Sequence, residues 1–226
     1  MIITIDGPTA SGKSRAARTV AQRLGIYYLS TGYLYRAVAY CALQRGAVLS
    51  ETTPLSPEII AFCADPKRLE YRYHNGQAQI LFDTQDITPA LKTPDVDRGA
   101  SIVSAQPAVR AALIDVQRHL ADHADIVADG RDCGTVVFPH ASHKFFLTAD
   151  LAERARRWQK DLGARGIMCT REEAIAALTE RDTRDATRTA SPLVIPAGAF
   201  VIDTTERSPG EVVDAILQKI KKTCSP

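Results

Sequence analysis

The chain has 226 residues, 45% of them hydrophobic, and a formal net charge of +2 at pH 7. This length suits one domain, or one domain with small insertions, and the hydrophobic share is sufficient for a buried core. A nearly neutral chain offers no bulk attraction for a polyanion, so we predict neither a nucleic-acid polymer nor a membrane as a partner. No apolar run is long enough to span a bilayer.

The cysteines and the beginning of the chain bear on the cellular compartment. The five cysteines are odd in number and widely spaced, with no C-x-x-C pair. This pattern is typical of reduced thiols rather than of a disulfide framework or a zinc site. The first strand-like run begins at residue 2, so we expect no secretory or transit segment before it. Both features predict a cytoplasmic protein.

The chain opens with the pattern of a strand, a glycine-rich loop and a helix. Residues 2–6 are mostly apolar and β-branched, and apolar residues recur at helical spacing from residue 16 to residue 24. Between these two runs lies a complete G-x-x-x-x-G-K-S motif, formed by Gly7, Pro8, Thr9, Ala10, Ser11, Gly12, Lys13 and Ser14.

This motif predicts a binding site for a nucleoside triphosphate. Backbone N–H groups of such a loop converge on phosphate oxygens, and the dipole of the following helix adds favourable charge. Lys13 is expected to reach the β- and γ-phosphates, and the Ser14 hydroxyl is expected to ligate Mg²⁺. The alternative is a glycine-rich turn with a surface lysine, which the full spacing and the flanking pattern disfavour.

Strand-like and helix-like runs alternate after the loop. The further strands are expected at residues 26–29, 126–128, 144–147 and 200–202. Helices are expected at residues 15–24, 33–45, 56–63, 94–105, 107–122 and 211–222, with two more that open at capping boxes formed by Asp150 with Glu153 and by Thr170 with Glu173. This alternation predicts an α/β protein with a P-loop three-layer fold, in which a parallel sheet lies between helices.

The pattern changes in the segment before residue 94. Two strand-like runs, residues 69–74 and 77–82, flank Asn75-Gly76, the strongest two-residue hairpin signal. Residues 85–87 form a third short run. We therefore predict a small antiparallel sheet inserted into the α/β chain.

Other classes of P-loop protein lack support in the sequence. A switch-type GTPase needs an N-K-x-D segment, which is absent, and a typical ATPase strand ends in Asp-Glu, whereas here the nearest strand ends in Asp129-Gly130. A small-molecule kinase needs arginines around the transferred phosphoryl group and a pocket for the acceptor. The sequence supplies such residues in residues 30–36, in Ser101 with Arg110, in residues 129–139 and in residues 180–188.

Each of these segments also has an ordinary structural interpretation. Residues 180–188 alone would suit a solvated, salt-bridged helix, Tyr35 would suit helix packing, and Asp132 would suit the cap of a turn. Arg181, Asp185 and Arg188, however, have the i, i+4, i+7 spacing that places side chains on one helix face.

Taken together, the segments resemble one family, bacterial cytidylate kinase, from Ile2 to about Asp203. The resemblance rests on I-D-G-P at residues 5–8, G-x-x-Y-R at 32–36, D-G-R-D-x-G-T-V-V-F-P at 129–139 and E-R-D-x-R-D-x-x-R at 180–188. It implies a nucleoside monophosphate kinase that uses ATP and Mg²⁺ to convert CMP or dCMP to the diphosphate. It also implies a monomer with a core at about residues 1–62 and 97–226, a CMP-binding insertion at about 63–96 and a lid at about 156–167.

The resemblance further assigns roles to individual residues. The implied catalytic residues are Lys13, Arg131, Arg181 and Arg188. ATP is expected to contact residues 7–14, Arg15 and Arg157, with Arg154 beside them. Apart from the resemblance, the place of Asp129 at the end of its strand makes it a candidate for orienting a metal-bound water. The implied CMP-binding residues are Thr31, Tyr35, Arg36, Ser101, Arg110, Arg131, Asp132, Arg181, Asp185 and Arg188.

Some positions depart from the family pattern. Ala10 replaces a frequent Gly and Ser30 a frequent Asp, Arg15 follows the loop where Thr is common, and Ala90 and Lys92 stand where Glu and Arg are usual. These departures affect the docking of the insertion and the fine substrate preference. Two alternatives stay open: a kinase for another small acceptor, such as UMP or AMP, and a non-catalytic nucleotide-binding regulator.

Overall fold

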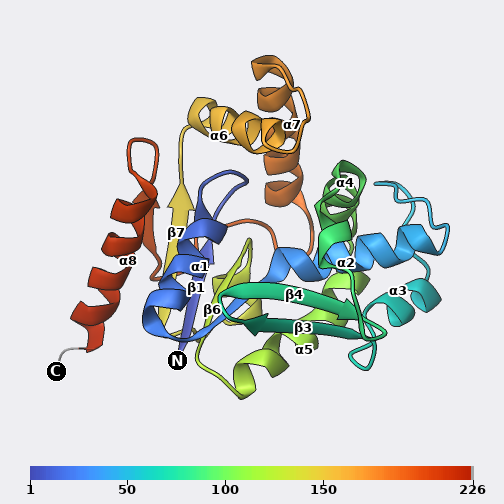
Figure 1. Cartoon of the computed structure of the whole chain (residues 1–226), viewed down its shortest axis with the longest axis horizontal. Helices are drawn as coiled ribbons and strands as arrows, with labels where there is room; N and C mark the ends of the chain where they lie inside the picture. The colour runs from blue at the N-terminus through green and yellow to red at the C-terminus, as the bar shows by residue number, and fades with distance from the viewer. Residues whose placement is uncertain (225–226) are drawn as a thin grey trace.

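The central sheet is parallel and is built around β1 (Ile2–Asp6). The computed structural model describes residues 1–224 and has five strands in the order β2-β6-β1-β7-β8 in this sheet (Figure 1). Every neighbouring pair of these strands is parallel. The other four strands are β2 (Tyr27–Ser30), β6 (Ile126–Gly130), β7 (His143–Thr148) and β8 (Phe200–Asp203).

Helices cover both faces of the sheet and complete three layers. On one face, α1 (Lys13–Leu24) and α8 (Pro209–Cys224) pack against Ile3 and Ile5 of β1. Ile126 of β6 points to the opposite face, because alternate residues of a strand face opposite sides. That face is covered by α2 (Thr31–Gln44), α3 (Pro57–Cys63), α4 (Pro94–Val103) and α5 (Pro107–Asp122). The predicted P-loop α/β fold is thus confirmed.

A pair of helices, α6 (Leu151–Gly163) and α7 (Arg171–Thr187), lies above the carboxyl ends of the strands (Figure 1). They share a small core of their own, formed by Ala155, Ala174 and Leu178. This arrangement places the polar sides of both helices near the edge of the sheet where parallel α/β proteins bind ligands.

Of the two predicted capping boxes, one is confirmed and one is wrong. The Thr170 hydroxyl accepts a hydrogen bond from the Glu173 N–H at 3.1 Å, and the Glu173 carboxylate accepts one from the Thr170 N–H at 2.8 Å. The Asp150 side chain makes no such cap at the start of α6. The Glu153 carboxylate pairs instead with the guanidinium groups of Arg156 and Arg157, since charge-assisted bonds are the stronger ones.

The segment between α3 and α4 holds the predicted antiparallel sheet, formed by β3 (Leu69–His74), β4 (Gln77–Phe82) and β5 (Gln85–Asp86). Asn75 and Gly76 have φ angles of 51° and 75°, the left-handed geometry that a two-residue hairpin turn requires. A short 3₁₀ helix, η1 (Thr88–Lys92), follows this sheet and was not predicted.

Tyr71 of β3 fastens this sheet to the core. Its hydroxyl donates to the Tyr28 carbonyl at 3.0 Å and accepts from the Ser30 N–H at 3.0 Å. The Tyr27 hydroxyl donates to the Tyr71 carbonyl at 3.1 Å. β2 therefore carries the antiparallel sheet and, at its carboxyl end, leads directly into α2.

Two further elements differ from the expectation. α2 begins at Thr31, two residues before the predicted start, so that residues 31 and 32 belong to the first turn of the helix. Residues Cys133–Val137 form a π-helical turn, η2, rather than an open loop. Among residues 1–224, no helix has the length and apolar character to cross a membrane. Cys41, Cys63, Cys133 and Cys169 are free thiols, and the side chain of Cys224 lies outside the part that the structure describes.

Candidate active site

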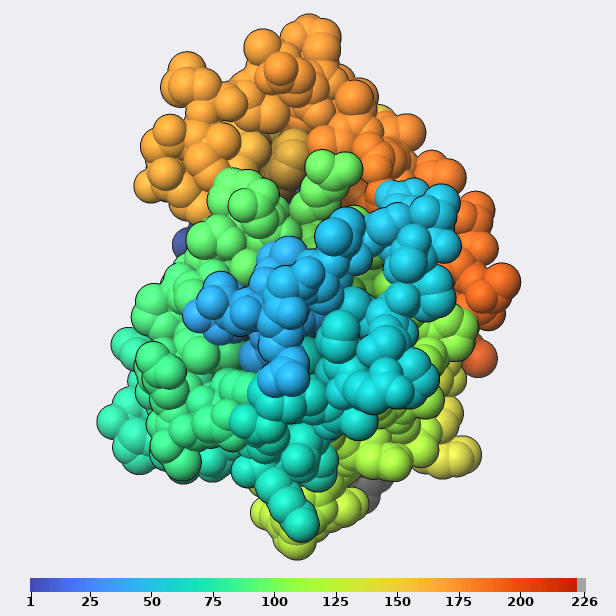
Figure 2. Space-filling model, turned by 90° about the vertical axis from the view of Figure 1, so that its right-hand side faces the viewer, coloured from blue at the N-terminus to red at the C-terminus, as the bar shows by residue number. Residues whose placement is uncertain are grey.

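A cavity of about 630 Å³ lies at the carboxyl ends of β1, β2 and β6. Its walls come from the phosphate-binding loop, α2, α4, α5, residues 129–132, α6 and α7. Figure 2 shows the orange α6–α7 segment above the green α4, with a hollow between them. The cavity therefore lies between the core and the helical pair, at the edge where open parallel sheets bind ligands.

The phosphate-binding loop has the backbone geometry that its glycines require. A Cβ atom added at Gly7 would lie 2.1 Å from the Leu147 carbonyl oxygen, so no side chain fits there. Gly12 has a φ of 87° and precedes α1. Ala10, which replaces a frequent Gly, has a φ of 61°, a conformation uncommon for a residue with a Cβ. Ala10 thus adopts a left-handed conformation that Gly takes without strain.

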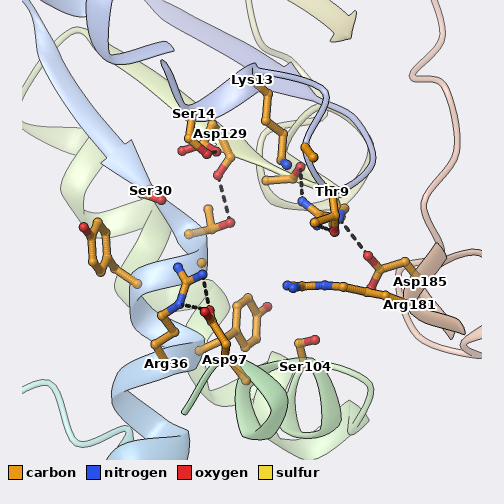
Figure 3. Close-up of a pocket in the computed structure, with 18 of the residues that line it drawn as sticks. Thr9, Lys13, Ser14, Ser30, Arg36, Asp97, Ser104, Asp129, Arg181 and Asp185 are labelled. Carbon is orange, nitrogen blue, oxygen red and sulfur yellow. Dashed lines mark hydrogen bonds and ion pairs between the residues drawn. The ribbon is translucent and has the colours of Figure 1, made fainter. Parts of the chain in front are cut away.

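Lys13 is buried at the first turn of α1 and points into the cavity (Figure 3). Its ammonium group donates to the Pro8 carbonyl at 3.1 Å. Burial, followed by the charge of Arg131, lowers the pKa of Lys13 to about 7. A buried cation with a depressed pKa is a group that a polyanionic ligand would stabilise strongly.

Ser14 and Asp129 meet at the end of β6. The Ser14 hydroxyl donates to Oδ2 of Asp129 at 2.6 Å, and the Tyr28 hydroxyl donates to Oδ1 at 2.8 Å. The Thr31 hydroxyl donates to the Asp129 backbone carbonyl at 3.0 Å. The carboxylate is therefore held beside the phosphate-binding loop by two hydroxyl groups.

Asp6 holds the loop that follows β6. Its two carboxylate oxygens accept from the Cys133 N–H at 2.9 Å and the Gly134 N–H at 2.8 Å, the first donors of the π-helical turn. Burial raises the pKa of Asp6 to about 6. Gly130 leaves room for this arrangement, because a Cβ there would lie 2.5 Å from the Thr31 hydroxyl oxygen. Asp6 and Gly130 together place Arg131 and Asp132 at the cavity.

A buried ion pair closes the end of the cavity away from the phosphate-binding loop. The guanidinium of Arg110 donates to the carboxylate of Asp132, and both side chains are only 3% exposed. Arg110 also donates to the Ser104 carbonyl at 2.9 Å and lies 5.2 Å from the centre of the Tyr35 ring. A second cation, Arg188, lies 3.9 Å from Asp132. Fixed charges of both signs are thus directed into a confined space.

Between the two ends, arginines converge from α2, the loop after β6 and α7, and these are Arg36, Arg131 and Arg181. Arg131 donates to the Asp185 carboxylate at 2.7 Å and to the Thr9 hydroxyl at 2.8 Å, so it reaches the phosphate-binding loop. Burial and the nearby charge of Arg131 lower the pKa of Arg181 to about 10. Nε of Arg181 is buried and has no hydrogen-bond partner among the described residues. An unsatisfied buried donor among cations indicates a place for an anion.

Comparison with known proteins decides the family. The model of the cytidylate kinase family matches residues 3–222. The chain belongs to the cytidylate kinase family. A cytidylate kinase of Bdellovibrio bacteriovorus is 40% identical over 98% of each chain, and one of Desulforamulus reducens is 41% identical over 97% of this chain and 96% of the other.

A solved structure agrees in fold. An uncharacterised protein of Eubacterium ventriosum matches with a TM-score of 0.53 and 12% identity over 98% of each chain. At this identity the likeness concerns the fold alone.

Most of the predicted site residues of this cytidylate kinase family member line the cavity. These are Thr9, Ala10, Gly12, Lys13, Ser14, Arg15, Thr31, Tyr35, Arg36, Arg110, Asp129, Arg131, Asp132, Arg157, Arg181, Asp185 and Arg188. Gly7, Pro8 and Ser11 belong to the loop backbone but not to the cavity wall. Segments that are distant in the sequence therefore meet at one cavity.

Two predicted residues outside the loop, Ser101 and Arg154, do not line the cavity either. The Ser101 hydroxyl accepts from Arg184 at 2.7 Å and lies behind the wall. Arg154 is buried and donates to the Thr9 carbonyl at 3.3 Å and to Asp182 at 2.6 Å, so it supports the phosphate-binding loop from behind. Their predicted direct contacts with CMP and ATP stay predictions.

The cavity also contains residues that sequence reasoning missed. Ser104, three residues after Ser101 and at the C-cap of α4, lines the wall beside Arg110. Asp97 of α4, Trp158 of α6 and Arg165 of the turn after α6 line it as well. None of them lies in the motifs that carried the resemblance. Trp158 and Arg165 fall within the predicted lid, whereas only the folded chain reveals Ser104 and Asp97.

Proposed function

We propose that this kinase transfers the γ-phosphoryl group of ATP to CMP or dCMP, giving ADP and CDP or dCDP. One observation carries the proposal. A single cavity joins the phosphate-binding loop to the buried Arg110–Asp132 pair, with Arg36, Arg131 and Arg181 between them. A donor nucleotide suits the loop, and an acceptor suits the opposite end, so that two phosphate chains would meet among the arginines.

The buried ion pair supports recognition of the acceptor base. Cytosine offers an amino donor beside ring acceptors, and a guanidinium and a carboxylate held side by side match this pattern. Uracil has a carbonyl in place of the amino group, so its oxygen would face the carboxylate of Asp132 with no hydrogen between the two acceptors. Because buried polar groups without a matching partner are costly, such a pocket rejects the wrong base strongly.

Phosphoryl transfer here needs positioning and charge neutralisation rather than a general base. The attacking oxygen of the acceptor phosphate is already an anion, so no proton has to be removed before it attacks the γ-phosphorus. Lys13, Arg131 and Arg181 line one continuous stretch of the cavity, where they would align the two phosphate groups and neutralise the charge of the transferred group. We assign Arg188 and Arg36 to the acceptor side of the same stretch.

We further propose Mg²⁺ as the metal that accompanies ATP. The Ser14 hydroxyl and the Asp129 carboxylate lie 2.6 Å apart beside the loop and provide the oxygen ligands that this ion prefers. No group of three or more acidic, His or Cys side chains that would hold a metal occurs within residues 1–224. That fits an ion bound mainly by nucleotide phosphates and water. When bound, it would neutralise phosphate charge, with Ser14 as ligand and Asp129 orienting a coordinated water.

The helical pair supports the proposed lid at residues 156–167. Arg156, Arg157 and Trp158 line the cavity from α6. Closure of such a segment excludes water, which suppresses hydrolysis of ATP. We propose a monomer, as the resemblance implies. The free thiols of the described cysteines fit a reducing cytoplasm.

A coupled assay of ADP release tests the proposal. The protein is incubated with ATP and Mg²⁺ and with each of CMP, dCMP, UMP, AMP and GMP. We expect rapid ADP release with CMP and dCMP alone. An equal rate with UMP or AMP would assign another acceptor, and ATP binding without any acceptor-dependent release would favour a non-catalytic regulator.

A further inference from the structure

Asp97 is an acidic residue in a cavity otherwise rich in arginine. It lies in the first turn of α4, faces the cavity in Figure 3 and has a side chain 25% exposed. Oδ1 accepts from Nε of Arg36 at 2.8 Å and from Nη2 at 2.5 Å. Oδ2 accepts from Nη1 of Arg165 at 3.2 Å. One carboxylate thus connects α2, α4 and the turn after α6.

The contact with Asp97 fixes one edge of the Arg36 guanidinium. Nε and Nη2 both point to the same carboxylate oxygen, so the plane of the group is set. Among the described residues, Nη1 of Arg36 has no hydrogen-bond or ion-pair partner. This free nitrogen lies beside Gly32, which has no side chain to cover it. An oxyanion in the cavity can therefore reach Arg36 without displacing Asp97.

The placement of Asp97 demands an explanation, because an anion near a phosphate site is unfavourable by charge alone. Arg36 and Asp97 act on Arg181 with opposite sign, since Arg36 lowers and Asp97 raises the pKa of Arg181. Asp185 forms a similar ion pair with Arg131, in which Oδ2 of Asp185 lies 2.7 Å from Nε of Arg131. Two carboxylates thus offset the repulsion among the arginines of the cavity.

The second oxygen of Asp97 reaches the proposed lid. Arg165 lies within residues 156–167, is 42% exposed and lines the cavity from the side of α6. Its contact with Asp97 joins α4 to the turn between α6 and α7. The same residue that orients Arg36 therefore also bridges the mouth of the cavity.

We propose that Asp97 is a positioning residue that holds Arg36 for the phosphate of the acceptor and, through Arg165, fastens the lid across the cavity. This inference rests on the proposed function, because it assumes an acceptor with a phosphate group. Asp97 touches neither nucleotide in this role. It couples the orientation of the acceptor-side arginine to the closed position of the lid.

The test compares Asp97→Asn and Arg165→Gln, singly and combined, with Asp95→Asn as the control. Asp95 lies in the same helical turn and is exposed, so its substitution removes the same charge without the two contacts. We expect Asp97→Asn to raise KM for CMP roughly tenfold through loss of a charge-assisted pair, with KM for ATP unchanged. Simple relief of charge repulsion would lower KM for CMP instead. Asp95→Asn should behave like the unchanged protein.

The lid contact is tested by the share of ADP that forms without CDP. Asp97→Asn and Arg165→Gln should each raise this hydrolytic share about threefold, the scale of a partly exposed ion pair. The double variant should show no further rise, because both changes break one contact. Asp97→Glu, which keeps the charge, should retain the KM for CMP better than Asp97→Asn, and melting curves verify that each variant folds.

The outcomes separate this inference from the proposed function. A KM for CMP that falls or stays constant in Asp97→Asn overturns the positioning role, and additive increases in hydrolysis overturn the lid contact. If the unchanged protein releases no ADP in response to CMP, the proposed function itself fails.

Discussion

The two ends of the cavity are built by different means. The phosphate-binding end comes from one contiguous stretch, in which backbone geometry at Gly7 and Gly12 and one lysine do most of the positioning. The acceptor end is assembled from α2, α4, α5, α7 and residues 129–132, and it depends on buried charged pairs. A local motif can tolerate a change such as Ala10, whereas a network of buried charges fails as a unit.

This difference has a physical origin. Backbone N–H groups at a helix N-terminus are present in any residue, so the loop needs only the right conformations. A carboxylate buried beside two guanidinium groups, as Asp132 is, stays favourable only while its partners stay in place. The acceptor end should therefore be the more fragile of the two.

Asp132→Ala tests this fragility and should have the largest effect. It leaves the Arg110 charge buried and deprives Arg188 of its neighbour, which should lower the free energy of unfolding by about 3–5 kcal/mol. CMP-dependent activity should be lost. Urea unfolding measures the first effect and the coupled assay the second.

A combined replacement sharpens the result. Because apolar residues of similar volume can replace a buried ion pair at little cost, Arg110→Met with Asp132→Leu should recover much of the stability and none of the activity with CMP. Recovery of activity would show that the pair acts only as a structural element.

The response to pH should distinguish the phosphate-binding end. The pKa of Lys13 is lowered to about 7, below the ordinary value of 10.5, so between these values the free folded protein binds fewer protons than the unfolded chain. The contribution of Lys13 to the stability of the folded protein is therefore present above pH 10.5 and is lost as the pH falls through 7. ATP reverses the balance, because its phosphates favour the charged ammonium. Binding of ATP at pH 8 should therefore take up about one proton, and affinity should fall at most about tenfold per pH unit above 7.

Calorimetry in two buffers of different ionisation enthalpy measures this uptake. Lys13→Met serves as the control, since it removes the titrating group and should abolish the buffer dependence. Binding of CMP should show no comparable dependence, because Lys13 lies at the other end of the cavity. Equal proton uptake with CMP would argue against the separation of the two ends.

The sequence predicts the locally determined parts of the molecule better than the parts that depend on contacts between distant residues. The hairpin was predicted with the correct ends, since Asn75 and Gly76 set the register of both strands locally. The phosphate-binding loop and the parallel sheet were likewise accessible, because both depend on local pattern. The π-helical turn after β6 was not, since it is held by Asp6, a residue 127 positions before Cys133.

The missed cavity residues show the same limit. Asp97 pairs with Arg36 across 61 positions, and nothing local marks either member of this pair as a partner of the other. From the sequence alone, Asp97 looks like one of the acidic residues that stabilise the first turn of many helices. The packing of α4 against α2 brings these residues to one wall of the cavity. This packing cannot be predicted from the sequence of either segment alone.

Ser101 and Ser104 pose the most subtle question, because Ser101 lies in the last turn of α4 and Ser104 is the C-cap of the same helix. The resemblance assigns Ser101 to the base, yet its hydroxyl is held by Arg184, whereas Ser104 lines the cavity. The Ser104 hydroxyl donates to the Ser101 carbonyl at 3.0 Å and keeps lone pairs that can accept from the amino group of cytosine. Ser104→Ala should therefore raise KM for CMP about threefold, the effect of one neutral hydrogen bond.

The discriminating measurement is the ratio of kcat/KM for CMP to kcat/KM for UMP, because only cytosine has an amino group that can donate to a serine hydroxyl. It should fall in Ser104→Ala and stay constant in Ser101→Ala, whose hydroxyl faces Arg184. The opposite result would mean that α4 turns when the acceptor binds and brings Ser101 to the base. In that case the acceptor end would take its final form only when the ligand binds, whereas the phosphate-binding loop is already formed without one.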